Sequence, residues 1–251
     1  MSKSDSFNIN RLLMLVYRQV FLKYKSILIS TGAAAGVIMV INLISMYNCS
    51  CNTVTQNLFN SVSIIIFFIL GMVFTSSSFE EMHTSAKGCF YLTLPVSNLE
   101  RLTAVWLVSS VLYFIWWIFA IFMINILIAL CGYLLLHIPF GWVELFNPIA
   151  LKTYGTFFII QTVFLFGAVY FSKNNFVKTI FALFLIGLSL NLITYLFVFI
   201  FFGNVHNLNT ITYYDTQYFD NLFQIMKYAY WIGVAPFFLI LSYLGLKERQ
   251  V

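Results

Sequence analysis

The sequence predicts an all-α integral membrane protein: six transmembrane helices, an N-terminal amphipathic interfacial helix, and both termini in the cytoplasm. Three observations carry this prediction. Of the 251 residues, 61% are hydrophobic and only 8% are charged, whereas a soluble domain carries about a quarter charged residues. Apolar runs recur at the length of about 20 residues that a helix needs to cross a bilayer. The basic residues gather in alternate segments between these runs.

The first 26 residues are expected to form a cytoplasmic N-terminus that contains the amphipathic helix, over residues 7–25. Arg11, Arg18 and Lys25 recur every seven residues and therefore share one face of a helix. Apolar side chains occupy the opposite arc, a pattern typical of a helix that lies flat in the interface with its basic side toward anionic headgroups. The alternative is an ordinary positive flank that fixes orientation, and both can hold.

Residues 27–251 are expected to form one six-span domain. No charged residue occurs from Ser26 to Phe79, but a polar insert at residues 48–53 divides this stretch into two helices. The first contains Gly32-x-x-x-Gly36, a small-residue face that we expect to pack inside the subunit. The six predicted spans are residues 27–47, 58–77, 103–130, 153–171, 177–202 and 228–246, with a cytoplasmic loop at 78–101 and an outer segment at 203–227.

The distribution of Lys and Arg agrees with this layout. With the N-terminus in the cytoplasm, 11 of the 13 basic residues fall in cytoplasmic segments, and only Lys152 and Lys227 fall outside. Such an asymmetry is typical of membrane proteins, whose cytoplasmic loops are enriched in Lys and Arg. The net charge of +5 therefore indicates orientation and contact with anionic headgroups, and we expect the bilayer, not nucleic acid, as its partner.

The loop at residues 78–101 carries two patterns that start helices. Ser78-x-x-Glu81 and Ser97-x-x-Glu100 both match the capping box, in which serine and glutamate side chains satisfy the first backbone amides of a helix. The first pattern predicts a short helix from Phe79 to Lys87, and the second predicts the start of the third span.

On that short helix, Phe79, Met82, His83 and Ala86 would share one face. Glu80 and Glu81 would lie at the positive end of the helix dipole. An aromatic ring and a methionine exposed to water commonly fill pockets at protein interfaces, which favours a docking surface. The alternative is that this face folds back onto the inner ends of the spans.

The sequence offers no recognisable catalytic, cofactor or metal site. No ionisable residue lies near the centre of a predicted span. Proton-driven transporters commonly place a carboxylate or histidine there. The H-E-x-x-H, G-x-S-x-G and P-loop patterns are absent, and no cysteine has partners at zinc-ligand spacing. The chain is therefore expected not to be an enzyme and not to bind ATP itself.

Phe79-Glu80-Glu81 and the stretch Tyr91-Leu-Thr-Leu-Pro95-Val-Ser97-Asn-Leu-Glu100-Arg101 resemble local sequences of ABC-2 permeases, the membrane subunits of ABC transporters. The second stretch is similar to the leucine-proline-x-serine motif of such permeases, notably those of Bacteroidetes-like bacteria. The layout adds to the resemblance over nearly the whole chain, since it has a basic N-terminal helix, six spans and an inner loop after the second.

The resemblance implies a permease subunit, expected to export its cargo, in the bacterial cytoplasmic (inner) membrane. It implies a separate ABC ATPase that binds ATP and Mg²⁺, and a second permease copy, identical or related. The loop would dock on that ATPase through a coupling helix. By resemblance, its residues are Phe79, Glu80, Glu81, Met82, His83 and Ala86.

Two alternatives to transport stay open. One is a structural, assembly or signalling membrane protein, and a membrane-embedded enzyme ranks behind it. For a transporter, uncharged and aromatic-rich spans favour lipidic, peptide or other amphipathic cargo over a multivalent ion.

Overall fold

The computed structural model describes residues 7–48, 52–83, 96–136, 148–202 and 216–248. Within these ranges every regular element is helical, and six segments are long and apolar enough to cross a membrane. The chain is thus an all-α, multi-pass membrane protein, as its composition predicts. The elements are α1 (Ile9–Asn48), α2 (Asn52–Ser76), the 3₁₀ turn η1 (Ser77–Phe79), α3 (Glu80–His83), α5 (Asn98–Trp106), the π-helical η2 (Leu107–Leu112), α6 (Tyr113–Leu136), α7 (Pro148–Tyr170), α8 (Asn175–Phe202) and α9 (Thr216–Glu248).

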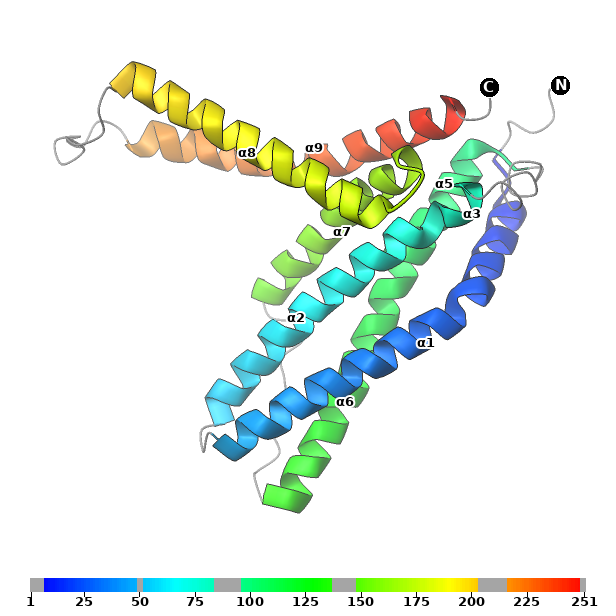
Figure 1. The fold of residues 1–251 in the computed structure, drawn as a ribbon, viewed down its shortest axis with the longest axis vertical. Helices are drawn as coiled ribbons and strands as arrows, with labels where there is room; N and C mark the ends of the chain where they lie inside the picture. The colour runs from blue at the N-terminus through cyan, green and yellow to red at the C-terminus, as the bar shows by residue number, and fades with distance from the viewer. Residues whose placement is uncertain (1–6, 49–51, 84–95, 137–147, 203–215, 249–251) are drawn as a thin grey trace.

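The predicted interfacial helix and the first span form one element, α1. Its 40 residues are continuous through residue 26, where the sequence suggested a boundary. At 1.5 Å per residue the helix is about 60 Å long, about twice the thickness of the hydrocarbon core. Figure 1 shows that its N-terminal part runs at an angle to the remainder. The basic segment is therefore a helical extension of the span.

Among the remaining helices, those of the third and sixth spans exceed their predicted lengths the most. The third begins at Asn98, not 103, and continues through η2 and α6 to Leu136. The sixth belongs to α9, which begins at Thr216, so the second half of the predicted outer segment continues into the span. Pro236 lies inside α9. Residues 203–215, the rest of that outer segment, lie outside the described residues.

Helix α7 connects two groups of helices. Helices α1, α2 and α6 run beside one another, and α8 and α9 extend away from them (Figure 1). Helix α7 contacts α2 on one side and α8 and α9 on the other. Two glycines permit close approach on that second side, because a methyl group on Gly155 would overlap Trp231 and one on Gly167 would overlap Thr179.

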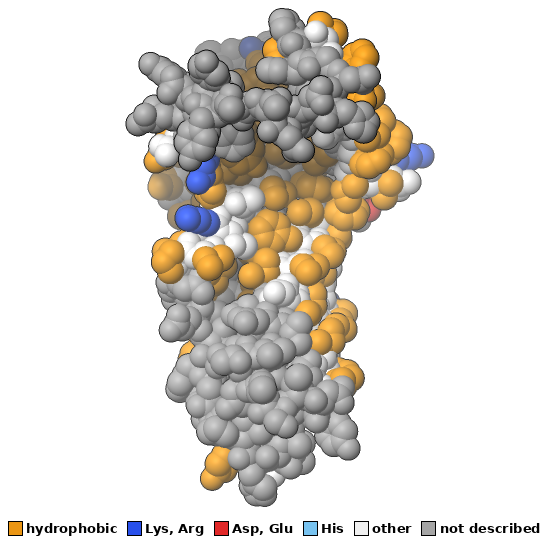
Figure 2. Space-filling view, turned by 90° about the vertical axis from the view of Figure 1, so that its left-hand side faces the viewer, with side chains coloured by type: hydrophobic (Ala, Val, Ile, Leu, Met, Phe, Trp, Pro, Cys, Tyr) orange, Lys and Arg blue, Asp and Glu red, His pale blue; other side chains and the backbone are white. Residues whose placement is uncertain are grey.

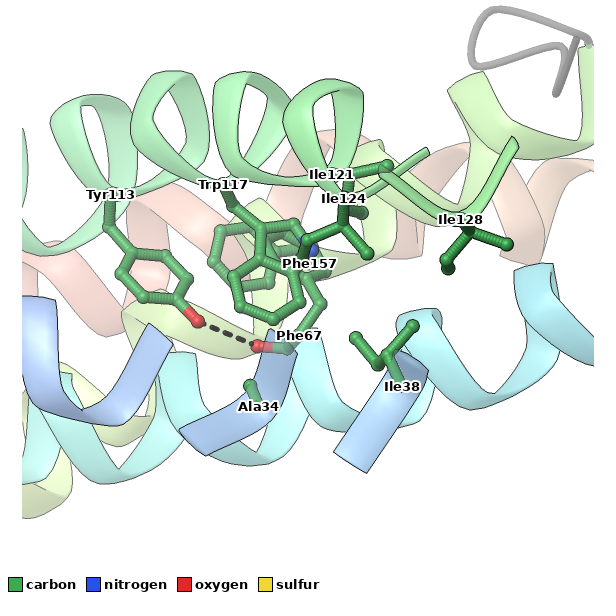
Figure 3. Close-up of a cluster of buried hydrophobic side chains, with 9 residues drawn as sticks. All are labelled: Ala34, Ile38, Phe67, Tyr113, Trp117, Ile121, Ile124, Ile128 and Phe157. Atoms are coloured by element: carbon green, nitrogen blue, oxygen red, sulfur yellow. Dashed lines mark hydrogen bonds between the residues drawn. The ribbon is translucent and has the colours of Figure 1, made fainter. Parts of the chain in front are cut away.

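The core between α1, α2, α6 and α7 combines packed aromatic rings with isoleucine side chains (Figure 3). The ring centroids of Phe67 and Phe157 lie 4.1 Å apart, and Tyr113 Oη donates a 3.1 Å hydrogen bond to the Phe67 carbonyl. Beside these rings, a methyl group on Gly71 would lie only 2.6 Å from Gln161 Nε2 and 2.7 Å from Phe157. Glycine at this position therefore allows α2 and α7 to approach each other.

Four segments predicted to share one side of the membrane meet at one end of the molecule. The Asn8 amide, just before α1, donates to Glu100 in α5. Leu246 near the end of α9 packs in the same cluster as Phe79, which follows α2. Asn175, at the start of α8, donates a 3.4 Å hydrogen bond to the Ser76 carbonyl. In Figure 2 the visible Lys and Arg side chains lie in the upper half of the view, among hydrophobic side chains.

Candidate functional site

The candidate site is the place where the N-terminal part of α1, the end of α2 and the beginning of α5 meet. We call it the helix junction, and it comprises residues 8–25, 74–83 and 97–105. Apolar packing brings these segments together: Leu12 and Leu15 of α1 are buried in a cluster with Ala104 of α5. The N-terminal part of α1 is thus attached along one side to the rest of the protein.

Glu100 joins the beginnings of two helices. The predicted capping box of α5 is confirmed, since the Glu100 amide donates to Ser97 Oγ at 3.2 Å and the Ser97 amide donates to Glu100 Oε2 at 2.9 Å. The other carboxylate oxygen, Oε1, accepts a 2.6 Å hydrogen bond from the Asn8 amide. Glu100 is fully buried, and the positive charge of Arg11 also acts on its carboxylate. One carboxylate therefore holds α1 to α5.

Lys23 forms the second connection, between α1 and the end of α2. Its Nζ donates hydrogen bonds of 3.2 Å to both Ser77 Oγ and Ser78 Oγ. The same ammonium lies 4.8 Å from the centroid of the Phe74 ring, a cation–π distance. Lys23 was not among the predicted residues of the basic face, because its position does not fit the seven-residue spacing of Arg11, Arg18 and Lys25. The run of three serines at 76–78 is the signal that could have suggested it.

The predicted capping box at Ser78 is wrong. Helix α2 passes without a break into η1, and Ser76 between them keeps helical dihedral angles, φ −60° and ψ −33°. Ser78 does not cap a new helix; its hydroxyl donates to the Phe74 carbonyl at 3.0 Å. The element that follows, α3, is described from Glu80 to His83, and the predicted end at Lys87 lies outside the described residues.

The predicted exposure of Phe79 and Met82 is also wrong. Phe79 is fully buried and Met82 is 9% exposed. The alternative fold-back onto the spans holds for both, since they pack against α5, α7 and α9. Their buried neighbours are Leu102, Val105, Leu165, Ala168, Val169 and Leu246. Apolar side chains beside other helix ends gain more from mutual burial than from exposure to water, which explains the difference.

The remaining predicted docking residues are Glu80, Glu81, His83 and Ala86. Glu80 is exposed. The side chains of Glu81 and His83, and the whole of Ala86, lie outside the described residues. Among the predicted docking residues whose side chains are described, only Glu80 is available to a partner.

The three predicted basic residues do not form one exposed face. Arg11 and Arg18 are half-buried and Lys25 is exposed. The Lys25 ammonium lies 5.9 Å from the centroid of the Tyr24 ring. Of the three, only Lys25 has an exposed side chain.

The junction is held together by hydrogen bonds and apolar packing. Among the described residues, no group of three or more His, Cys, Asp or Glu side chains could hold a metal ion. Two charged groups, Glu100 and Lys23, instead link α1 to the helix ends on either side of the loop at 84–95.

Comparison of the chain with models of protein families, with curated proteins and with solved structures finds no match in any of the three.

Proposed function

We propose that the chain is the permease subunit of an ABC-2-type exporter, driven by a separate ATPase that docks on the loop at residues 78–101. The observation that carries this proposal is the packing of η1 and α3 against α5, α7 and α9. A subunit that pushes on this loop would move several spans at once, as rigid-body transport cycles require. The resemblance of the loop to ABC-2 permeases supports the same assignment.

In this proposal Phe79 and Met82 transmit force and do not touch the partner. Their side chains fill the space between four helix ends, so a displacement of α3 would be passed to α5, α7 and α9. Glu100 and Lys23 would carry the same displacement to α1. The docking surface itself would include Glu80, which is exposed, and residues of the loop that follow it.

Orientation follows from charge. Of the basic residues described, Arg11, Arg18, Lys23 and Lys25 belong to the end of the molecule where the loop begins. Basic segments remain on the cytoplasmic side of a membrane. We therefore assign this end, with both termini, to the cytoplasm of a bacterial cell, where an ATPase could reach it. Two permease copies and two ATPase copies would make the working unit, and the uncharged spans favour amphipathic cargo.

The test is co-purification with the ABC ATPase encoded beside this chain's gene, followed by measurement of ATP hydrolysis. We expect the ATPase to co-purify and Glu80→Lys to weaken its binding, because a reversed charge on the docking surface repels what the carboxylate attracts. Glu248→Lys is the matched control, since Glu248 is an exposed glutamate at the end of α9. Failure of any ATPase to bind the wild-type protein would favour a structural or signalling role.

A further inference from the structure

A groove of about 560 Å³ lies between α1 and the helix formed by η2 and α6. One wall consists of Val20, Tyr24, Ile27 and Leu28 of α1, and the opposite wall includes Leu112 and Trp116. Its volume falls in the range of roughly 300–1,000 Å³ that is usual for small-molecule sites. Its surface is almost entirely apolar, so its occupant is a hydrocarbon group.

The groove crosses the boundary between the charged and the uncharged parts of α1. In α1, Arg18 precedes the residues of the groove wall, Lys23 and Lys25 lie between Val20 and Ile27, and no charge follows until Glu80. Residues 20–28 extend over about 12 Å of helix. One end of the groove therefore lies at headgroup depth, and the other lies among acyl chains.

Charge at the headgroup end selects the kind of lipid. Lys25 is exposed, and its ammonium lies over the ring of Tyr24, which itself lines the groove. The Lys23 ammonium instead donates hydrogen bonds to Ser77 and Ser78. Neither wall contains an acidic residue, because residues 20–28 and 108–119 include no Asp or Glu. A negative group at this end would meet the exposed Lys25, and neither wall of the groove presents an acidic side chain to it.

We propose that this groove binds one acyl chain of an anionic phospholipid, whose phosphate group pairs with Lys25. The π-helical η2 forms part of the wall, and such distortions of a helix are frequent at functional sites. The groove also reaches Tyr113, which hydrogen-bonds to α2, so the lipid contacts the core that connects α2 and α6. This inference is independent of the transport function proposed above.

The test uses quenching of Trp116 fluorescence by lipids with brominated acyl chains, in vesicles of phosphatidylcholine containing the full-length protein. Brominated phosphatidylglycerol and brominated phosphatidylcholine are each added at the same low mole fraction. The Trp116 contribution is the difference between the wild-type protein and Trp116→Phe. We expect the anionic lipid to bind about fivefold more tightly, which corresponds to about 1 kcal/mol, the contribution of one lysine at an anionic surface.

Two pairs of variants separate a site from general attraction. Lys25→Gln should remove the preference for the anionic lipid, whereas Lys247→Gln, an exposed lysine of α9, should retain it. Leu28→Phe should narrow the groove and reduce quenching by both lipids, whereas Ile29→Phe, exposed but outside the groove, should not. Equal quenching by the two lipids in the wild-type protein would overturn the proposal. So would a preference that persists in Lys25→Gln, or quenching that Leu28→Phe leaves unchanged.

Discussion

Helices α2 and α8 are equally apolar over their most apolar stretches, yet they occupy different surroundings. In that stretch of α2, 33% of the residues are buried, and in that of α8 none is. Apart from Thr179 near its start, α8 has no buried residue among those with described side chains. Apolar character therefore places both helices in the membrane but does not decide which of them packs within the subunit.

Small and polar side chains account for the difference. Hydrocarbon tails are as apolar as leucine, so helices associate in membranes through close packing and hydrogen bonds between them. Helix α2 has Gly71 in close contact with α7, and its Thr75 hydroxyl donates to Gln161 Oε1 of that helix. In α8, the amide of Asn191 donates to the carbonyl of Gly187 in the same helix. Polar groups satisfied within their own helix provide nothing to hold a neighbour.

The largest expected difference between the two regions concerns phenylalanine. Phe79→Ala should destabilise the protein by about 3–5 kcal/mol, because it removes a fully buried ring and leaves a cavity. Phe181→Ala on α8 should change stability by less than about 0.5 kcal/mol, since that side chain is 59% exposed. Thermal unfolding of the purified protein in one detergent measures both. Similar losses in the two variants would mean that α8 is packed against something the single chain does not contain.

The behaviour of Phe79 differs from what the docking hypothesis implied. An exposed anchor could be replaced without loss of stability, whereas this ring supports the packing of α5, α7 and α9. Loss of ATPase binding in a Phe79 variant would therefore not by itself locate the docking surface. Glu80→Lys is the more informative change, because that side chain is exposed.

The next largest difference in stability is expected between alanine substitutions of two glycines, one in α2 and one in α8. Gly71→Ala should cost about 1–3 kcal/mol, because the added methyl group would overlap Gln161 and Phe157 and force them to move. Gly187→Ala in α8 should be neutral or stabilising by up to about 1 kcal/mol, since nothing lies within 4 Å of the new methyl group and alanine favours the helix. Urea or thermal unfolding in detergent would detect the opposite signs. Equal losses in both variants would contradict the packing described for α2.

Some contacts of the fold are specified by residues close together in the sequence, and others are not. The capping box at Ser97 could be predicted because its donors and acceptors are three residues apart. The identical pattern at Ser78 fails because α2 simply continues through it, and the Phe74 carbonyl offers the hydroxyl a partner one turn back. The bond from Asn8 to Glu100 joins residues 92 positions apart, and no local pattern specifies it.

Composition predicted the six spans but not their neighbours. Each span follows from an apolar length that only a bilayer accommodates. The burial of Phe79 depends on where α5, α7 and α9 end in space, and the sequence around Phe79 alone indicates a water-exposed face. The fold class was therefore predictable, whereas the interior of the helix junction was not.

The smallest expected effect concerns the amide side chains of the two regions. Asn191→Leu should change stability by no more than about 0.5 kcal/mol, because this exposed amide already donates to Gly187 at 2.8 Å and contacts no other helix through that bond. Gln161→Leu in α7 is the matched change in the packed region, and it should cost about 1–3 kcal/mol because it leaves the buried Thr75 hydroxyl without its acceptor. Thermal unfolding of both variants in the same detergent, with the oligomeric state measured alongside, makes the comparison. A loss for Asn191→Leu as large as that for Gln161→Leu, accompanied by dissociation of a dimer, would show that α8 meets a second copy of the chain and not lipid.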